Sequence, residues 1–299
     1  MDQTEPPFQR DSDALNLPAQ LMLDQIGPNR FRNRYNQPNM FRAIFGGSTI
    51  AQALAAADRT VEGRAAHSLH AYFLRPGVAD VPVEFEVERV RDGGRFSSRR
   101  VVAIQSGAVI LSAECSYKTP IEGFRHQQAS KVAFDPERAL DPTTLIDPDP
   151  EKVPPHLKTF QRRFAVDVRL SGERGFSTKG DAERHYWLRA ASAAGHDDPA
   201  LQRQILTFMS DFMFAGVPLS PHTIALAGPH IFIASLDHAI WFHRPARCDD
   251  WLLFETESPN AEGGVNLTLG RVYNRAGELV ASVAQEALQF PLTPKPPAA

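Results

Sequence analysis

Small and apolar residues predict a helix early in the chain. Residues 48–58, STIAQALAAAD, are rich in alanine and follow a Gly46-Gly47 pair. Alanine and leucine favour helix, and glycines followed by serine are typical of a helix N-terminus. A single apolar stripe is formed by Ile50, Leu54, Ala57 and Val61. The other faces carry small residues rather than charges, so we expect other elements to approach this helix closely.

Strand-like segments follow the predicted helix, and the second half of the chain repeats the plan. In the first half these segments are 67–74, 81–90, 96–104 and 108–117, and Val81 to Glu88 alternates between apolar and polar residues. That period is typical of a half-exposed strand. In the second half a helical 200–214 precedes strand-like segments near 231–243, 250–257, 264–273 and 278–290. One helix followed by four antiparallel strands, twice, predicts an α+β fold in which each sheet curls around its helix.

The two halves also share short sequences at a constant spacing. HAYFLRP at 70–76 recurs as HAIWFHRP at 238–245, and the turn glycines Gly107 and Gly277 are 170 residues apart. Chance recurrence of common turn residues is the alternative, but the conserved order and spacing favour a duplicated domain. A proline-dense stretch at 135–155 predicts a boundary. We expect domains at 15–125 and 166–292, joined by a linker at 126–165.

Composition excludes several classes of protein. The net charge of −3 gives no support for nucleic-acid binding, and 42% hydrophobic with 22% charged residues is typical of a globular chain. No run of about 18 apolar residues occurs, so we expect no membrane span. The two cysteines, Cys115 and Cys248, and the polar start of the chain suit a reducing compartment. We therefore expect a cytoplasmic protein.

Familiar catalytic motifs are missing from the sequence. It contains no G-x-S-x-G, P-loop, G-x-G-x-x-G or H-E-x-x-H. The pairs His67/His70 and His238/His243 could be considered as metal ligands. Their odd spacing places the members of each pair on opposite faces of a strand, so we expect no metal site.

Two polar residues stand out in apolar surroundings, and a third is a weaker candidate. Asp211 lies within LTFMSDFMF, where a carboxylate must be paired, hydrogen-bonded or raised in pKa, and helix capping is the alternative. Gln285 interrupts an apolar strand face, and a structural hydrogen bond to a loop is its alternative. Its counterpart in the first half is Cys115, a small hydrophobe, so we expect a site in the second half alone. Ser235, in IFIASLDHAIWF, is weak when taken alone.

Five segments together resemble the type II acyl-CoA thioesterases, the bacterial TesB-like enzymes and their peroxisomal relatives. They are FGGSTIAQAL at 45–54, HSLHAYFLRPG at 67–77, RDGGRFSSRRVVAIQSG at 91–107, IASLDHAIWFHRP at 233–245 and VASVAQEAL at 280–288. The resemblance spans roughly residues 20–290. It implies a double hotdog, two tandem domains that each wrap a sheet around a helix. It also implies hydrolysis of acyl-CoA to a carboxylic acid and coenzyme A without a cofactor, in a homo-oligomer (a dimer or larger).

The same resemblance assigns roles to the three polar residues. The family's S-D-[FL]-x-F aspartate falls on Asp211, the hydroxyl residue of I-A-[ST]-[LI]-D-H on Ser235, and the V-Q-E glutamine, here A-Q-E, on Gln285. Together they would hold and activate the attacking water, with Asp211 as base. Backbone N–H groups near Gly46-Gly47 are one hypothetical source of oxyanion donors, and His67 or His70 is an alternative base. The family's FGGQ-x-x-GQA is changed at Ser48 and Ala51, which bears on the preferred acyl chain length.

Other readings remain open from the sequence. A hotdog-fold hydratase or dehydratase could use Asp237 and His238, although adjacent strand residues point to opposite faces. A non-catalytic acyl-CoA-binding protein is the other alternative, which the presence of all three site residues disfavours. Four basic residues could attract the phosphates of coenzyme A or simply be solvated at the surface: Arg75, Arg99, Arg100 and Arg244.

Overall fold

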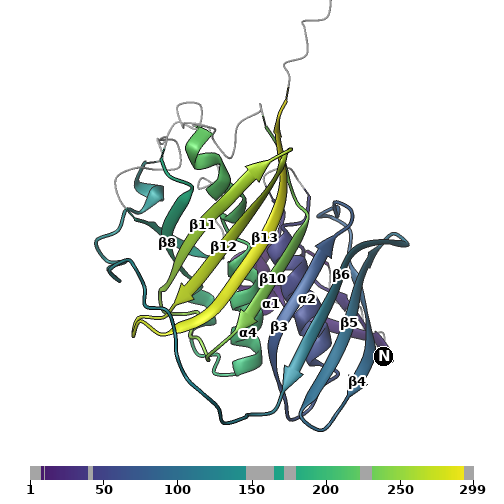
Figure 1. Cartoon of the computed structure of the whole chain (residues 1–299). Helices are drawn as coiled ribbons and strands as arrows, with labels where there is room; N and C mark the ends of the chain where they lie inside the picture. The colour runs from purple at the N-terminus through teal and green to yellow at the C-terminus, as the bar shows by residue number, and fades with distance from the viewer. Residues whose placement is uncertain are drawn as a thin grey trace, which may run out of the picture.

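The computed structural model describes residues 8–9, 11–39, 43–145, 165–171, 180–222 and 231–292. Within these ranges thirteen strands form one antiparallel sheet that curves in front of the helices (Figure 1). The first-half strands are β1 (Leu23–Gly27), β2 (Arg30–Asn33), β3 (Ala65–Phe73), β4 (Glu84–Asp92), β5 (Phe96–Gln105) and β6 (Ala108–Lys118). The second-half strands are β7 (Asp167–Leu170), β8 (Glu183–Arg189), β9 (Ile231–Ser235), β10 (Asp237–Phe242), β11 (Leu252–Glu262), β12 (Val265–Tyr273) and β13 (Leu279–Pro291).

The strand order repeats about the middle of the sheet. It reads β1-β2-β4-β5-β6-β3-β10-β13-β12-β11-β8-β7, with β9 pairing β13 beside β10. The halves meet where β3 and β10 pair antiparallel, with Ala71 opposite His238. Backbone hydrogen bonds therefore continue from one half into the other. This arrangement is the double hotdog of the α+β class that the resemblance implies.

Two helices fill the concave side of the sheet. Helix α2 (Gly46–Asp58) is buried along its length, from Gly47 to Ala57, and it packs against α4 (Pro199–Ser210) of the second half. Close approach on every side is possible because most of its side chains are no larger than alanine or serine. The expectation of a small-residue helix wrapped by a sheet is confirmed.

The second half differs from its prediction in two places that matter for the site. The helix expected over 200–214 ends at Ser210 and is followed by a 3-10 segment, Phe214–His222, which contains Pro218 and Pro221. The strand expected over 231–243 is broken at Leu236 into β9 and β10. Strands β1, β2, β7 and β8 were not predicted, since they are short and carry many polar residues.

The start of the expected linker belongs physically to the second half. Val132, Phe134 and Ala139 pack against a cluster that contains Trp187 and Trp251. Gln127 donates a hydrogen bond to the carbonyl oxygen of Gly277. Most of 146–165 lies outside the described residues, so the boundaries at 15–125 and 166–292 remain proposals.

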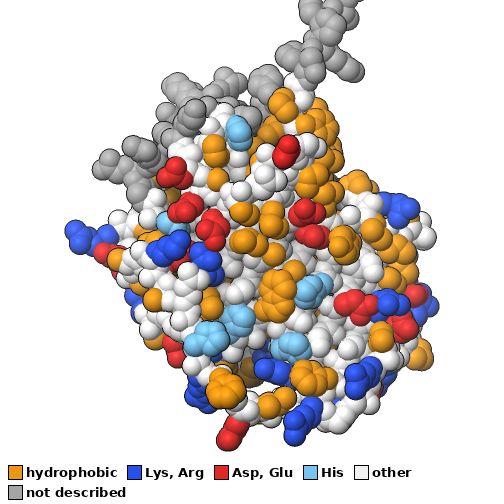
Figure 2. Space-filling model, viewed as in Figure 1, with side chains coloured by type: hydrophobic (Ala, Val, Ile, Leu, Met, Phe, Trp, Pro, Cys, Tyr) orange, Lys and Arg blue, Asp and Glu red, His pale blue; other side chains and the backbone are white. Residues whose placement is uncertain are grey.

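The outer face of the central sheet is mixed in character. Figure 2 shows histidine, hydrophobic and charged side chains interspersed over these strands, without a large area of one charge. Exposed aromatic residues on this face include Tyr72 and Trp241. In the described parts of the chain, no helix has both the length and the apolar character to cross a membrane.

Candidate functional site

Asp211 lies between the two helices of the concave side. It is the C-cap residue of α4, with backbone dihedrals of φ −86° and ψ −9°. Its Oδ2 accepts a hydrogen bond of 2.6 Å from the backbone N–H of Gly47, in the first turn of α2. The capping alternative is thus partly right: Asp211 caps a helix, but the helix of the other half. One half of the chain therefore supplies the carboxylate and the other supplies its donor.

The glycine pair before α2 makes this contact possible. A Cβ at Gly46 would lie 2.9 Å from Oδ2 of Asp211, and one at Gly47 would lie 2.5 Å from the carbonyl oxygen of Phe208. Both distances are shorter than a carbon atom tolerates. The absence of side chains lets the start of α2 approach the end of α4.

Burial strongly affects the Asp211 carboxyl group. Asp211 is 8% exposed, and the nearby residues Phe208, Met209 and Phe212 are buried as well. Loss of hydration raises the pKa of Asp211 to about 7, although hydrogen bonds from Gly47 and from the Gln285 side chain favour the charged form. The carboxyl group therefore titrates close to neutral pH. The first-half donors near Gly46-Gly47 were proposed for an oxyanion, but the Gly47 N–H is engaged by this carboxylate.

Gln285 and Ser235 are brought together from different strands. Gln285 is 2% exposed, and its Nε2 donates a hydrogen bond of 2.9 Å to Oγ of Ser235. The predicted interruption of the apolar face of β13 is therefore confirmed, and its amide faces a strand rather than a loop. Cys115, the first-half counterpart, is buried in the core. The Gln285 side chain also lowers the pKa of Asp211, so this amide acts on both of the other predicted residues.

The break between β9 and β10 shapes this arrangement. Leu236 donates its backbone N–H to the carbonyl oxygen of Glu286, and the side chain of Asp237 accepts the Glu286 N–H at 2.7 Å. Ser235 and His238 are three residues apart, so an unbroken strand would point them to opposite faces. Because the strand is broken, both side chains contact Gln285.

His238 and Ser210 are members of this group that the sequence did not predict. His238 Nδ1 lies 2.6 Å from Oε1 of Gln285, and its Nε2 lies 2.8 Å from Oγ of Ser210. Burial lowers the pKa of His238 to about 4. Asp237 points to the partly exposed side and does not pair with His238, as expected from alternation. The signal available in the sequence was a histidine within the largely apolar run 231–242, IFIASLDHAIWF, which also contains Ser235 and Asp237.

The remaining histidine candidates lie elsewhere. His67 bonds to Ser116 at 2.8 Å, and its pKa is lowered by burial and by Lys118. His70 packs its ring edge-on to Trp241, and His243 bonds to Ser282. Among the described residues no cluster of three His, Cys, Asp or Glu side chains could hold a metal ion.

The four arginines considered as contacts for the phosphates of coenzyme A each bond to different partners within the protein. Arg99 is 1% exposed and donates to Thr60 and Asp92, so the expectation of a surface role for Arg99 was wrong. Arg100 pairs with Glu88 and Glu114. The remaining two, Arg75 and Arg244, donate to backbone carbonyl groups.

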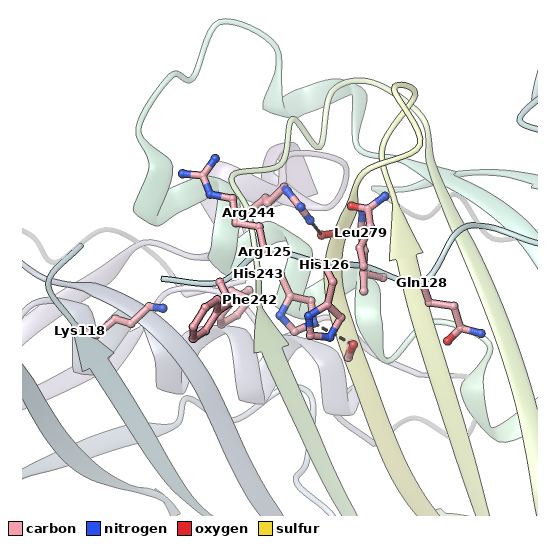
Figure 3. Close-up of a pocket in the computed structure, with 11 residues that line it drawn as sticks. Lys118, Arg125, His126, Gln128, Phe242, His243, Arg244 and Leu279 are labelled. Atoms are coloured by element: carbon pink, nitrogen blue, oxygen red, sulfur yellow. Dashed lines mark hydrogen bonds between the residues drawn. The ribbon is translucent and has the colours of Figure 1, made fainter. Parts of the chain in front are cut away.

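A cavity of about 740 Å³ lies apart from these residues (Figure 3). It forms where the segment 124–128 crosses the end of β10 and the start of β13. Its wall includes Lys118, Arg125, His243, Arg244 and Ser282. Ser282 and Gln285 are three positions apart in a regular stretch of strand, so their side chains lie on opposite faces. The sheet therefore separates this cavity from Asp211.

Comparison with protein families matches both halves of the chain. Residues 36–117 match the family model described as acyl-CoA thioesterase N-terminal domain, and residues 136–289 match the acyl-CoA thioesterase C-terminal domain. Acyl-CoA thioesterase 2 of Haemophilus influenzae is 35% identical over 282 residues, covering 93% of this chain and 98% of the relative. Human acyl-coenzyme A thioesterase 8 is 34% identical over 279 residues, covering 90% and 86%.

Solved structures agree with this result. The acyl-CoA thioesterase II TesB2 from Mycobacterium marinum superposes with a TM-score of 0.75 at 36% identity, covering 94% of this chain and 99% of that one. A tesB protein of Mycobacterium avium subs paratuberculosis gives a TM-score of 0.75 at 32% identity, with coverage of 92% and 98%. The similarity thus extends over both halves and over nearly all of each chain.

Proposed function

This chain belongs to the type II acyl-CoA thioesterases and is a thioester hydrolase, and from that premise we propose that Asp211 activates the attacking water while Ser235 and Gln285 position it. The observation that carries this proposal is the convergence of the three side chains. They come from the end of α4, from β9 and from β13. The amide of Gln285 donates to Ser235 and favours the charged form of Asp211. The substrate is an acyl-CoA.

Asp211 has the properties of a general base at neutral pH. A base is most effective when its pKa lies near the working pH, because it is then both deprotonated and basic. Burial raises the pKa of Asp211 to about 7, while an exposed aspartate would be a much weaker base. The Gly47 N–H holds the carboxylate in place and keeps part of it in the charged form.

Gln285 and Ser235 are suited to holding a water molecule. A primary amide has two N–H groups, so Gln285 can bond to Ser235 and to Asp211 together. Because Ser235 Oγ accepts from the amide, its own hydroxyl proton is left to donate to the water or to the thioester oxygen. Water held between these groups would be aligned for attack on the carbonyl carbon.

The proposed reaction needs only water and the thioester. As the water oxygen bonds to the carbonyl carbon, one water proton moves to Asp211 and the carbonyl oxygen takes the negative charge. Collapse of this intermediate breaks the C–S bond. The proton held by Asp211 passes to the departing thiolate, giving a carboxylic acid and coenzyme A and restoring the base.

Release of coenzyme A, read as new free thiol, tests this proposal on a panel of short, medium and long acyl-CoAs. We expect Asp211→Asn to lower kcat by about 1000-fold or more, the scale for loss of a group central to catalysis. Ser235→Thr keeps the hydroxyl and should retain most turnover, whereas Ser235→Ala should not. Asp58→Asn, at the end of the other helix, is the matched control. Full turnover by folded Asp211→Asn would reject the base assignment.

Two further proposals come from the resemblance. We propose that the enzyme works in the cytoplasm and assembles as a homo-oligomer. Light scattering of the purified chain at several concentrations tests the second proposal, since a single monomer mass throughout would contradict it.

A further inference from the structure

The side chain of His238 is buried in a polar chain of contacts. It is 1% exposed, and both ring nitrogens have partners: Gln285 at Nδ1 and Ser210 at Nε2. Burial lowers its pKa to about 4, so the ring is neutral at neutral pH. A neutral imidazole donates from one nitrogen and accepts at the other. The ring must therefore be held in one of two tautomers.

The partners select the tautomer. The contact at Nδ1 is the carbonyl oxygen of Gln285, which can only accept, so Nδ1 carries the proton. Nε2 then accepts from the hydroxyl of Ser210, which lies 2.8 Å away. The same hydroxyl also donates to the carbonyl oxygen of Thr207, 2.8 Å away, so its one proton is shared between that oxygen and Nε2 of the ring.

All donors in this series of hydrogen bonds point in the same direction. With Nδ1 protonated, Ser210 donates to His238, His238 donates to Gln285, and Gln285 donates to Ser235. The Gln285 side chain also favours the charged form of Asp211. Ser210 and Asp211 are adjacent residues, so both ends of this series of contacts lie at the C-terminal end of α4. If the amide of Gln285 were reversed, its oxygen would face the carboxylate of Asp211 and both N–H groups would turn toward the ring. The amide oxygen of Gln285 and the carboxylate of Asp211, both acceptors, would then face each other, which is unfavourable in a buried site.

We propose that His238 is a positioning residue for thioester hydrolysis, and that it holds the amide of Gln285 with its N–H groups toward Asp211 and Ser235. This inference rests on the proposed function of those three residues. His238 itself touches no reacting atom. Its effect passes through Gln285, and Ser210 supports it by fixing the tautomer.

His243 provides a matched control for His238. Its Nε2 lies 2.9 Å from Oγ of Ser282, so it also links the end of β10 to β13 through a polar side chain. Unlike His238 it is exposed and lies on the other side of the sheet. Replacing it removes a similar bond without affecting Gln285.

Steady-state kinetics on the full-length enzyme test the proposal. His238→Leu should lower kcat about 100-fold with KM changed less than about threefold, because misplacement of a reacting group by about 1 Å has an effect of that size. His238→Asn can supply an N–H near the position of Nδ1 and should recover kcat to within about tenfold of the native enzyme. His243→Leu should match the native enzyme.

The dependence of kcat/KM on pH separates positioning from loss of structure. In His238→Leu the amide can reverse, its oxygen then faces Asp211, and the acid limb should move to higher pH. The acid limb should keep its native position in His238→Asn and His243→Leu. A variant that is only less folded would lose amplitude without moving the limb.

Nitrogen NMR of ¹⁵N-histidine-labelled native enzyme is independent of activity. It should show His238 protonated at Nδ1; protonation at Nε2 would overturn the proposal. A folded His238→Leu enzyme with native kcat would also overturn it, while an inactive Asp211→Asn enzyme would leave the proposed function standing. Turnover by Asp211→Asn would instead defeat the proposed function. If His238→Leu does not fold, the kcat of Ser210→Ala and the NMR measurement of the native enzyme test the proposal in its place.

Discussion

At the scale of single residues, the two helices end in buried carboxylates with different partners. Asp58 ends α2 and accepts from the hydroxyl of Tyr117 at 2.8 Å and from the amide of Gln204 at 2.7 Å. Burial raises the pKa of Asp58 to about 6, against which these two hydrogen bonds act. Both oxygens of Asp58 are thus occupied by side chains. The Asp211 carboxylate instead accepts from the backbone N–H of Gly47, and the Gln285 side chain favours its charged form.

The activity should follow the titration of Asp211. Because a general base must be deprotonated, kcat/KM should rise with pH and reach half its plateau near the pKa of about 7. His67, the alternative base, has a pKa lowered from 6.5 by burial. If His67 were the base, kcat/KM would therefore reach half its plateau below pH 6.5. A pH–rate profile of the native enzyme with one acyl-CoA distinguishes the two.

Asp211→Asn should also stabilise the protein. A carboxyl group whose pKa is raised by folding contributes stability below its unfolded pKa, and this contribution is lost as the pH rises through the folded value of about 7. Above that pH the buried charge costs up to about 4 kcal/mol, since one pKa unit is worth about 1.4 kcal/mol. Denaturant unfolding at about pH 8 should therefore show a larger unfolding free energy for Asp211→Asn. An unchanged value would mean that the buried charge has no net cost, and a smaller value would mean that the carboxylate is stabilising; either result would contradict the prediction.

At the scale of elements, the site depends on two irregular features. One is the glycine start of α2, which brings a backbone N–H to Asp211. The other is the break at Leu236, which lets Ser235 and His238 both contact Gln285. A regular helix start with side chains and a continuous strand would each separate the groups that meet here.

Gly47→Ala should weaken both packing and catalysis. The new methyl group would lie 2.5 Å from the carbonyl oxygen of Phe208, and a backbone atom cannot move aside cheaply. We expect a loss of about 1–3 kcal/mol in unfolding free energy, as for overpacked cores, together with a lower kcat. Gly123→Ala, in open space at the surface, is the matched control. Native stability and kcat in Gly47→Ala would show that the two helices can separate without harm.

At the scale of the whole molecule, the halves are interdependent. The β3–β10 ladder joins their sheets, and α2 packs on α4 between them. The site itself takes Gly47 from one half and Asp211 from the other. Neither half alone contains the complete set of groups.

Two chains made by dividing the protein before Phe124 should therefore work only together. This position is exposed, and the segment that follows it packs on the second half. We expect residues 1–123 and 124–299 to copurify when coexpressed and to release coenzyme A from acyl-CoA. Residues 124–299 alone should be inactive, and full turnover by that fragment would contradict a site shared between the halves.

Much of this architecture could be predicted because local patterns determine it. Small residues indicated α2, alternation indicated β4, and polar residues in apolar runs indicated Asp211 and Gln285. The role of His238 could not be predicted, because alternation assumes an unbroken strand and the break at Leu236 changes which side chains share a face. The bond from Gly47 to Asp211 joins residues 164 positions apart, and no local pattern reports such a contact.

The covalent joining of the two halves allows equivalent positions, such as those of Gln285 and Cys115, to carry different residues. In a dimer of identical chains, every substitution appears in both copies at once, so neither copy can specialise alone. A fused duplicate is free of that restriction. Strand β13 carries the amide of Gln285, for which we propose a role in hydrolysis, while β6 carries the thiol of Cys115, buried in the core near Asp58. A fused pair of halves can therefore keep a site in one half and a structural support in the other, each open to separate selection.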